Sequence, residues 1–310
     1  MRFILCLILG FLFQLEVCSQ TYPKDLPSKI QECLKESPFS EGNDPYRQQY
    51  EGSHTMLRSA KIIASQDGWY CVDNFRVSLE EKENPEDSTP NWNRVAFAPS
   101  RAKNLAFLLG LFHSKLPLRL GHLFALIEFE KGALLCSDPS VNLQGLVVSF
   151  EAMRKRSERY DMVEGMKDKY PGIFVLGSYY DVLQKAKLFY RSLEAFPLRG
   201  EGLASRYVQS SVDQILSSSG DMYHTILNSC ITRQYDLLNM ALPEGNKLTT
   251  RYTLFGKPLF RTMGAFFPGF VSFQLSRHAS GSQEYSSTEG LKLLLDAHGK
   301  GEEIPFFQDS

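Results

Sequence analysis

A few side chains that are suited to acid–base catalysis lie far apart along the chain. His113 and His122 flank an apolar segment, and Asp138 follows them in sequence. An imidazole oriented by a carboxylate is a common general base near neutral pH, so these residues form one candidate catalytic set. His278 stands beside a Ser- and Gly-rich stretch, and loops of this kind often carry function. The alternative places each histidine at the end of a structural element, without a catalytic role.

Basic residues gather in one charged segment of the chain. They are Arg154, Lys155, Arg156 and Arg159. Such a cluster predicts a binding site for an acidic partner or an anionic glycan. Acidic residues in the same segment partly neutralise it, so the alternative is the solvated face of a helix expected over 151–169. The formal net charge of −1 predicts no nucleic-acid binding.

The motifs of several enzyme classes are absent from the sequence. It contains no Gly-X-Ser-X-Gly, no His-Glu-X-X-His and no phosphate-binding Gly-X-X-X-X-Gly-Lys. It also shows no recognisable cysteine–histidine arrangement of a thiol protease. We therefore predict neither a metal site nor a cofactor.

The first nineteen residues have the pattern of an export signal. Arg2 precedes an apolar run from Phe3 to Phe13, and Val17-Cys18-Ser19 offers small residues for cleavage before Gln20. The run is shorter than the roughly 20 apolar residues of a membrane span. We therefore predict a secreted, extracellular chain with no transmembrane segment after cleavage. An uncleaved anchor, as in a Golgi-lumen transferase, is the alternative, although the chain lacks an Asp-X-Asp metal motif.

Cysteine count and compartment together predict disulfides. Removal of residues 1–19 leaves Cys33, Cys71, Cys136 and Cys230. An even number of cysteines in an oxidising compartment predicts two bridges, with three possible connectivities. We favour Cys33–Cys71 and Cys136–Cys230, each worth about 2–4 kcal/mol. Buried free thiols are the alternative.

The interleaving of expected elements predicts an α+β fold. Helices and strands alternate without a regular β-α-β period, which favours antiparallel strands and hairpins packed with several amphipathic helices and stabilised by disulfides. Residues 20–90 form an N-terminal segment with a short helix and a strand. Residues 91–310 form the main globular domain.

The most apolar stretch after the signal, residues 104–136, is expected to form the centre of the core. An all-apolar helix is predicted from Pro99 to about Phe112. A hairpin is predicted over Leu123 to Cys136, with its turn at Lys131-Gly132. Further helices are predicted over 181–196, 205–217, 221–241 and 286–298.

These patterns favour a secreted binding or interaction protein without a catalytic set. Its partner would be an extracellular protein or a small ligand of unknown identity. A secreted hydrolase with dispersed His and Asp residues is the second hypothesis, and the Golgi-lumen transferase is the third.

Overall fold

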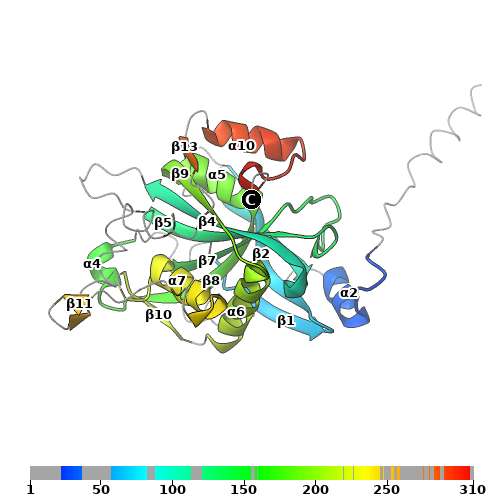
Figure 1. Ribbon diagram of the computed structural model, residues 1–310, viewed down its shortest axis with the longest axis horizontal. Coiled ribbons are helices and arrows are strands. Elements are labelled where there is room, and N and C mark those ends of the chain that lie inside the picture. The colour runs from blue at the N-terminus through cyan, green and yellow to red at the C-terminus, as the bar shows by residue number, and fades with distance from the viewer. Residues whose placement is uncertain are drawn as a thin grey trace, which may run out of the picture.

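A large β-sheet is the centre of the computed structural model, with helices on both faces (Figure 1). The structure describes residues 22–36, 57–81, 88–112, 121–154, 158, 160–218, 220–225, 227–244, 247, 253–254, 257–258, 275, 279, 283–286 and 290–307. Within these residues, eleven strands join one sheet, in the order β13-β9-β4-β5-β7-β8-β2-β3-β6, with β1 beside β2 and β10 beside β8.

The strands of this sheet vary from two to twelve residues. They are β1 (Lys61–Gln66), β2 (Trp69–Glu80), β3 (Thr89–Phe97), β4 (Ala102–Phe112), β5 (Gly121–Phe129), β6 (Leu134–Cys136), β7 (Leu146–Ala152), β8 (Tyr170–Ser178), β9 (Tyr190–Leu198), β10 (Met222–Tyr223) and β13 (Gln283–Ser286). A separate pair consists of β11 (Thr253–Leu254) and β12 (Lys257–Pro258). The helices are α2 (Ser28–Lys35), η3 (Pro99–Arg101), α4 (Met162–Gly165), α5 (Tyr179–Phe189), α6 (Leu203–Ser217), α7 (Cys230–Ala241), α10 (Gly290–Gly299) and η5 (Pro305–Phe307).

The fold is mixed α/β and rich in strands, with a mostly antiparallel sheet. The pairing of β2 with β8 is parallel, and the other strand pairings of the large sheet are antiparallel. The antiparallel part of the α+β prediction is therefore correct, whereas the helices cover a dominant sheet and do not form a helical core. The expected N-terminal segment contributes β1 and β2 to the same sheet as the strands that follow residue 90.

The predicted helix from Pro99 to Phe112 is wrong. Only η3 is helical, and Ala102–Phe112 is the central strand β4, hydrogen-bonded to β5 and β9. Both faces of β4 are buried, so its sequence is a continuous apolar run rather than an alternating one. Such a run does not distinguish a buried strand from a buried helix.

The predicted hairpin over 123–136 is also only half present. The chain does turn at Lys131-Gly132, where Gly132 has a φ of 77° that suits glycine. The strand that follows, β6, pairs with β3 and not with β5. The turn thus passes the chain to another strand at the far edge of the sheet.

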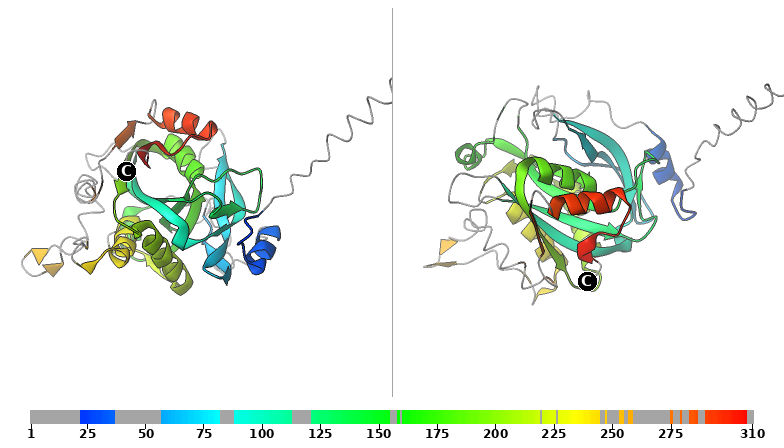
Figure 2. Two further views of the ribbon diagram at one scale, coloured as in Figure 1. Left: turned by 45° about the vertical axis from the view of Figure 1, so that its right-hand side comes forward. Right: turned by 90° about the horizontal axis from the view of Figure 1, so that it is seen from above.

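Two helical layers cover the sheet (Figures 1 and 2). Helices α6 and α7 pack on one face of the sheet. The odd-numbered apolar side chains of β4 and β5 and the even-numbered ones of β7 form the larger apolar cluster on this face. Helices α5 and α10 cover the other face together with η5. Among the described residues, no helix combines the length and apolar character needed to cross a membrane.

A disulfide holds the first helix to the sheet. Cys33 of α2 is bonded to Cys71 of β2, as the sequence predicts. Cys136 and Cys230 are buried free thiols, so the predicted second bridge is wrong. Cys136 lies on the edge strand β6, whereas Cys230 is the first residue of α7, which packs on β5 and β7. The two thiols therefore belong to elements that contact different strands of the sheet.

Candidate active site

The site begins where strands β5 and β7 stop pairing. Their ladder joins Ala125–Ile127 to Leu146–Val148. His122 precedes this ladder on β5, and Ser149 follows it on β7, so both extend from the same end of the paired region. The Nε2 atom of His122 lies 2.8 Å from the Ser149 hydroxyl, and the imidazole also contacts the ring of Phe124.

Helix α7 places a cysteine near this end of the β5–β7 ladder. Ser229 and Thr232 form a capping box, which starts the helix at Cys230 and not at Asp221 as predicted. The preceding residues form β10 and a turn instead. A thiol in the first helical turn lies at the positive end of the helix dipole, which favours its ionised form.

The thiol of Cys230 and the imidazole of His122 lie close enough for each to perturb the pKa of the other. Burial opposes ionisation of the thiol, yet the pKa of Cys230 lies below its usual value because His122, the Leu123 amide and the Tyr223 hydroxyl all stabilise the thiolate. Burial likewise lowers the pKa of His122, but Cys230 and Glu151 outweigh it, so this pKa is raised. Each partner therefore favours the charged form of the other.

Tyrosine side chains line the other side of the sulfur. The Tyr223 hydroxyl accepts a 3.4 Å hydrogen bond from the Cys230 amide and also contacts the thiol. Burial and the neighbouring Cys230 raise the pKa of Tyr223, so its hydroxyl keeps its proton. Tyr160 packs edge-on against Tyr223 and shares a 2.7 Å hydrogen bond with Thr225. These contacts fix the β10 segment beside the cysteine.

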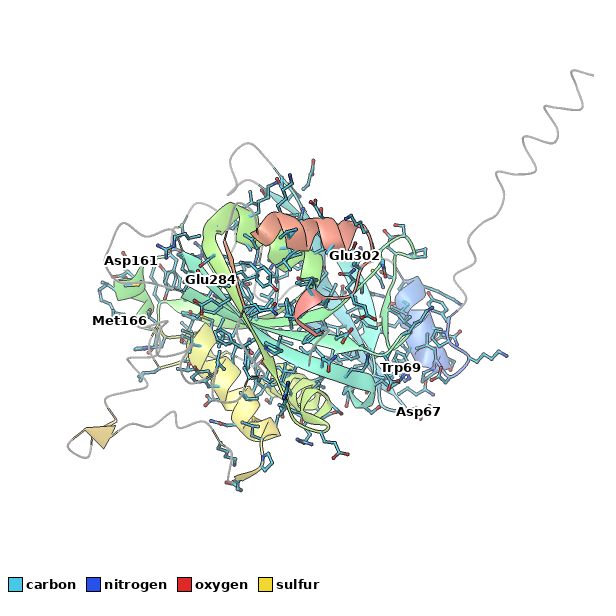
Figure 3. All side chains as sticks on the ribbon, turned by 45° about the horizontal axis from the view of Figure 1, so that its top comes forward. Asp67, Trp69, Asp161, Met166, Glu284 and Glu302 are labelled. Atoms are coloured by element: carbon cyan, nitrogen blue, oxygen red, sulfur yellow. A yellow bond between two sulfur atoms is a disulfide. The ribbon has the colours of Figure 1, made fainter. Side chains whose placement is uncertain are left out.

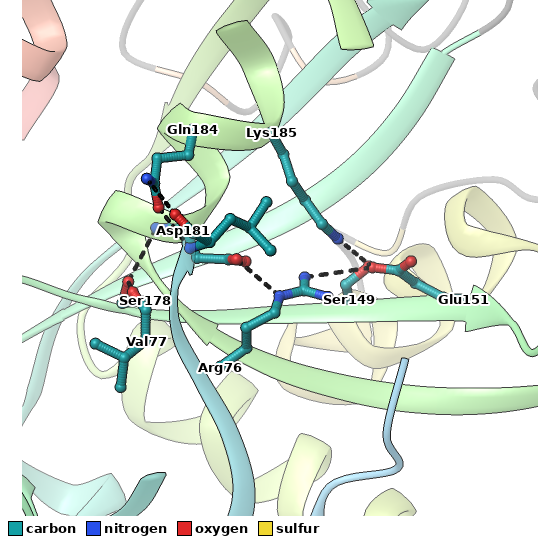
Figure 4. A network of polar contacts seen from close by, with 9 residues as sticks. Arg76, Val77, Ser149, Glu151, Ser178, Asp181, Gln184 and Lys185 are labelled. Carbon is teal, nitrogen blue, oxygen red and sulfur yellow. Dashed lines mark hydrogen bonds and ion pairs between the residues drawn. The ribbon is translucent and has the colours of Figure 1, made fainter. Parts of the chain in front are cut away.

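Behind His122 lies a buried group of charged side chains (Figure 4). Ser149 donates to Glu151 at 3.3 Å, and Lys185 of α5 donates to the same carboxylate at 3.0 Å. Arg76 of β2 lies 4.0 Å from Glu151 and donates to Asp181 at 2.7 Å. Burial disfavours the charge on Glu151, but the surrounding cations hold the pKa of this carboxyl well below its usual range.

The candidate residues proposed from sequence divide into three groups. His122 lies in the site, whereas Asp138 lies in the loop after β6 and accepts hydrogen bonds from the amide and hydroxyl of Ser140. The residue that contacts His122 is thus Ser149, and the predicted His122–Asp138 pairing is not formed. His113, Lys155, Arg156, Arg159 and His278 lie outside the described residues. Arg154 is half-buried, two residues after the end of β7.

Sequence reasoning missed Cys230, Ser149, Glu151 and Tyr223. The sequence shows no recognisable cysteine–histidine arrangement of a thiol protease, yet the fold brings Cys230 close to His122. The available signal was the Ser229-Cys230-Ile231-Thr232 segment, whose Ser and Thr spacing suits a helix start that presents the cysteine. Within the described part of the chain, no group of three or more His, Cys, Asp or Glu side chains is arranged to hold a metal ion.

The α4 end and the α2 end of the molecule differ in their relation to this site. Figure 3 shows Asp161 and Met166, at α4, at one end of the molecule, and Asp67 and Trp69 at the other. Helix α4 is joined to the site segment because the Thr225 amide donates to the Gly165 carbonyl and the Thr225 hydroxyl to that of Met162. The α4 end of the molecule therefore borders the cysteine, and the α2 end does not.

Comparison with known proteins gives one result. None of the curated proteins and none of the solved structures compared with the chain matches it. The family described as the Lnb N-terminal periplasmic domain matches residues 88–261, more than half of the chain. The matched region contains His122, Ser149, Glu151 and Cys230 and leaves out β1 and β2. The chain therefore belongs to the family of Lnb N-terminal periplasmic domains.

Proposed function

We propose that the protein is an exported thiol enzyme that transfers or hydrolyses acyl groups, with Cys230 as the nucleophile and His122 as the general base. The observation that supports this proposal most directly is that Cys230, at the start of α7, lies near His122 of β5, which lowers the pKa of the thiol. A thiolate held by an imidazole at a helix N-terminus is the arrangement that activates nucleophilic cysteines.

The reaction follows from these two groups. The Cys230 sulfur attacks the carbonyl carbon of an ester or amide, which forms a carbon–sulfur bond, while His122 holds the thiol proton. His122 then gives this proton to the leaving alcohol or amine as its bond to the carbonyl carbon breaks. Water or another acceptor next attacks the thioester, His122 removes its proton, and the cysteine sulfur leaves.

The same segment supplies a donor for the negative charge that develops on the carbonyl oxygen. The Tyr223 hydroxyl lies beside the sulfur and accepts the Cys230 amide hydrogen, so its own hydrogen is available to donate. Because burial keeps Tyr223 protonated, its hydroxyl is a donor across the neutral pH range. Donors placed beside the nucleophile stabilise the oxyanion of acyl transfer.

This proposal develops the hydrolase hypothesis from the sequence, with the acidic partner Asp138 replaced. The prediction of a binding protein rested on the lack of a catalytic set, and a contacting thiol–imidazole pair removes that reason. A family of periplasmic domains fits an exported chain. We propose that residues 1–19 direct this export and that the enzyme acts outside the cytoplasm.

The test uses the purified full chain and p-nitrophenyl acetate, a small activated ester. We expect release of p-nitrophenol and, in acid-quenched samples, addition of one acetyl group to the peptide that contains Cys230. Cys230→Ala should lose both signals and His122→Ala should slow them strongly. Cys136→Ala is the matched control, since Cys136 is the other buried free thiol, and it should keep both. Equal acetylation of the Cys230→Ala and unmodified chains would refute the proposal.

A further inference from the structure

We propose that Glu151 is a positioning residue of this site and acts on His122 through the hydroxyl of Ser149. This inference rests on the proposed function for its biological meaning, but its test measures the state of Cys230 and His122 and needs no turnover. Glu151 lies on β7, two positions after Ser149, and both side chains extend to the α5 face of the sheet.

The direction of the hydrogen bonds supports a relay. Ser149 donates its only hydroxyl hydrogen to Glu151, so its oxygen can only accept at the 2.8 Å contact with His122 Nε2. Nε2 must then carry a hydrogen. In a neutral imidazole this leaves Nδ1 unprotonated and free to accept the proton of Cys230. The carboxylate of Glu151 therefore sets the tautomer that a general base requires.

The surroundings of Glu151 keep it charged for this role. Lys185 and Arg76 both contact it, and Asp181 binds Arg76 on the side away from Glu151 (Figure 4). The buried group therefore contains two cations and two anions, and protonation of His122 is favoured by the anion nearest to it. The charged and titratable groups that face His122, Ser149 and Glu151 are Cys230 of α7, Lys185 and Asp181 of α5, Arg76 of β2, Tyr190 of β9 and Tyr223 of β10.

A purely structural ion pair would not make the same contacts. Asp181 is such a pair member: its side chain is 1% exposed, it binds Arg76 at 2.7 Å, and its contacts do not include Ser149 or His122. Removal of its charge perturbs the same buried group without touching the relay. Asp181→Asn is therefore a matched control for Glu151→Gln.

The experiment measures the rate of Cys230 carboxamidomethylation by iodoacetamide from pH 5 to 10, read by peptide mass. Cys136 is an internal reference, because burial raises the pKa of its thiol to about 11 and it should react only at high pH. We expect Glu151→Gln and Ser149→Ala to raise the midpoint for Cys230 by about one pH unit, which is about tenfold slower reaction below the midpoint. Ser149→Thr, which keeps the hydroxyl, should restore most of the rate, and Asp181→Asn should change it less than about threefold.

A second measurement covers the case in which the reagent fails to reach the sulfur. The His122 ring proton is followed by NMR during pH titration, and its midpoint should fall in Glu151→Gln and Ser149→Ala but stay in Asp181→Asn. Equal midpoints in the Glu151→Gln and unmodified chains, or equal shifts in Glu151→Gln and Asp181→Asn, would overturn the relay. A normal relay with no acetylation of Cys230 by the ester would instead overturn the proposed function alone.

Discussion

Removal of Glu151 and removal of Lys185 should cost different amounts of stability, although the two side chains form one ion pair. Glu151→Gln leaves Lys185 and Arg76 buried with Asp181 as their remaining anion in the group. Loss of one member of a buried pair that leaves an uncompensated charge costs about 3–5 kcal/mol. Lys185→Met leaves Glu151 beside Arg76 and removes an ammonium whose pKa is lowered by burial and by Arg76.

Burial of the charged Lys185 side chain therefore costs free energy, and replacement of this side chain removes that cost. The lost hydrogen bond to a charged group is worth about 1.5–3 kcal/mol, and the relief offsets part of it. We expect Lys185→Met to lower the free energy of unfolding by about 1–2 kcal/mol, less than Glu151→Gln. The pKa of Glu151 is lowered, so its neighbours stabilise the charged carboxylate. The pKa of Lys185 is also lowered, so its surroundings disfavour the charged ammonium.

Urea unfolding measures this difference. Trp92 lies against Arg76 of the charged group, and Trp69 belongs to the apolar cluster that contains Ile30 of α2, so fluorescence reports both regions. Equal slopes with shifted midpoints would show that stability alone has changed. A loss for Lys185→Met equal to or larger than that for Glu151→Gln would refute the reasoning.

The pH dependence gives a second check on Glu151. Its folded-state pKa lies below the ordinary value of 4.5, so the unfolded chain binds the proton more readily in acid. Glu151 therefore contributes stability that is present above about pH 4.5 and lost as the pH falls through the folded-state value. The stability gap between the unmodified chain and Glu151→Gln should narrow from pH 6 to pH 3. A gap that stays constant or widens would contradict an ionised, paired Glu151.

Further perturbations test the fold around the site. Replacement of both Cys33 and Cys71 by Ser opens a loop with a sequence separation of 38 and should cost about 3–4 kcal/mol in thermal unfolding under oxidising conditions, with no difference from the parent chain in reductant. Gly172→Ala places a Cβ 2.3 Å from Cζ of the fully buried Phe150 and should cost about 1–3 kcal/mol. Gly299→Ala, whose Cβ meets no atom within 4 Å, should leave the melting temperature unchanged or higher.

The sequence predicts the parts of this fold that depend on local pattern. The short helix expected within residues 20–90 and the Cys33–Cys71 bridge are found as expected. The helix expected over 181–196 ends at Phe189, because the chain from Tyr190 onward is strand β9, which pairs with β4. The described residues of 104–136 include the buried central strands β4 and β5, so this stretch is core as predicted, but as strands. Buried strands and buried helices give the same continuous apolar run, and the choice between them is made by the neighbouring strands, which lie elsewhere in the sequence.

The site was missed for a different reason. The inference of an oxidising compartment led to a disulfide for every remaining cysteine, which assigned Cys230 a structural role before its position was known. Two cysteines can form a bridge only when their Cα atoms lie within about 7 Å of each other. In this fold, Cys136 lies on an edge strand. Capping by Ser229 instead turns the thiol of Cys230 toward His122.

The free thiol is informative because of the compartment proposed for the chain. Exposed thiols oxidise readily outside the cytoplasm, yet Cys230 is 5% exposed and its sulfur is enclosed by His122, Leu123 and Tyr223. These contacts lower the pKa of the thiol, which a cysteine kept only for packing would not need, as the raised pKa of Cys136 shows. The chain thus contains two buried thiols with opposite electrostatic surroundings, and only the one beside an imidazole is prepared for nucleophilic attack.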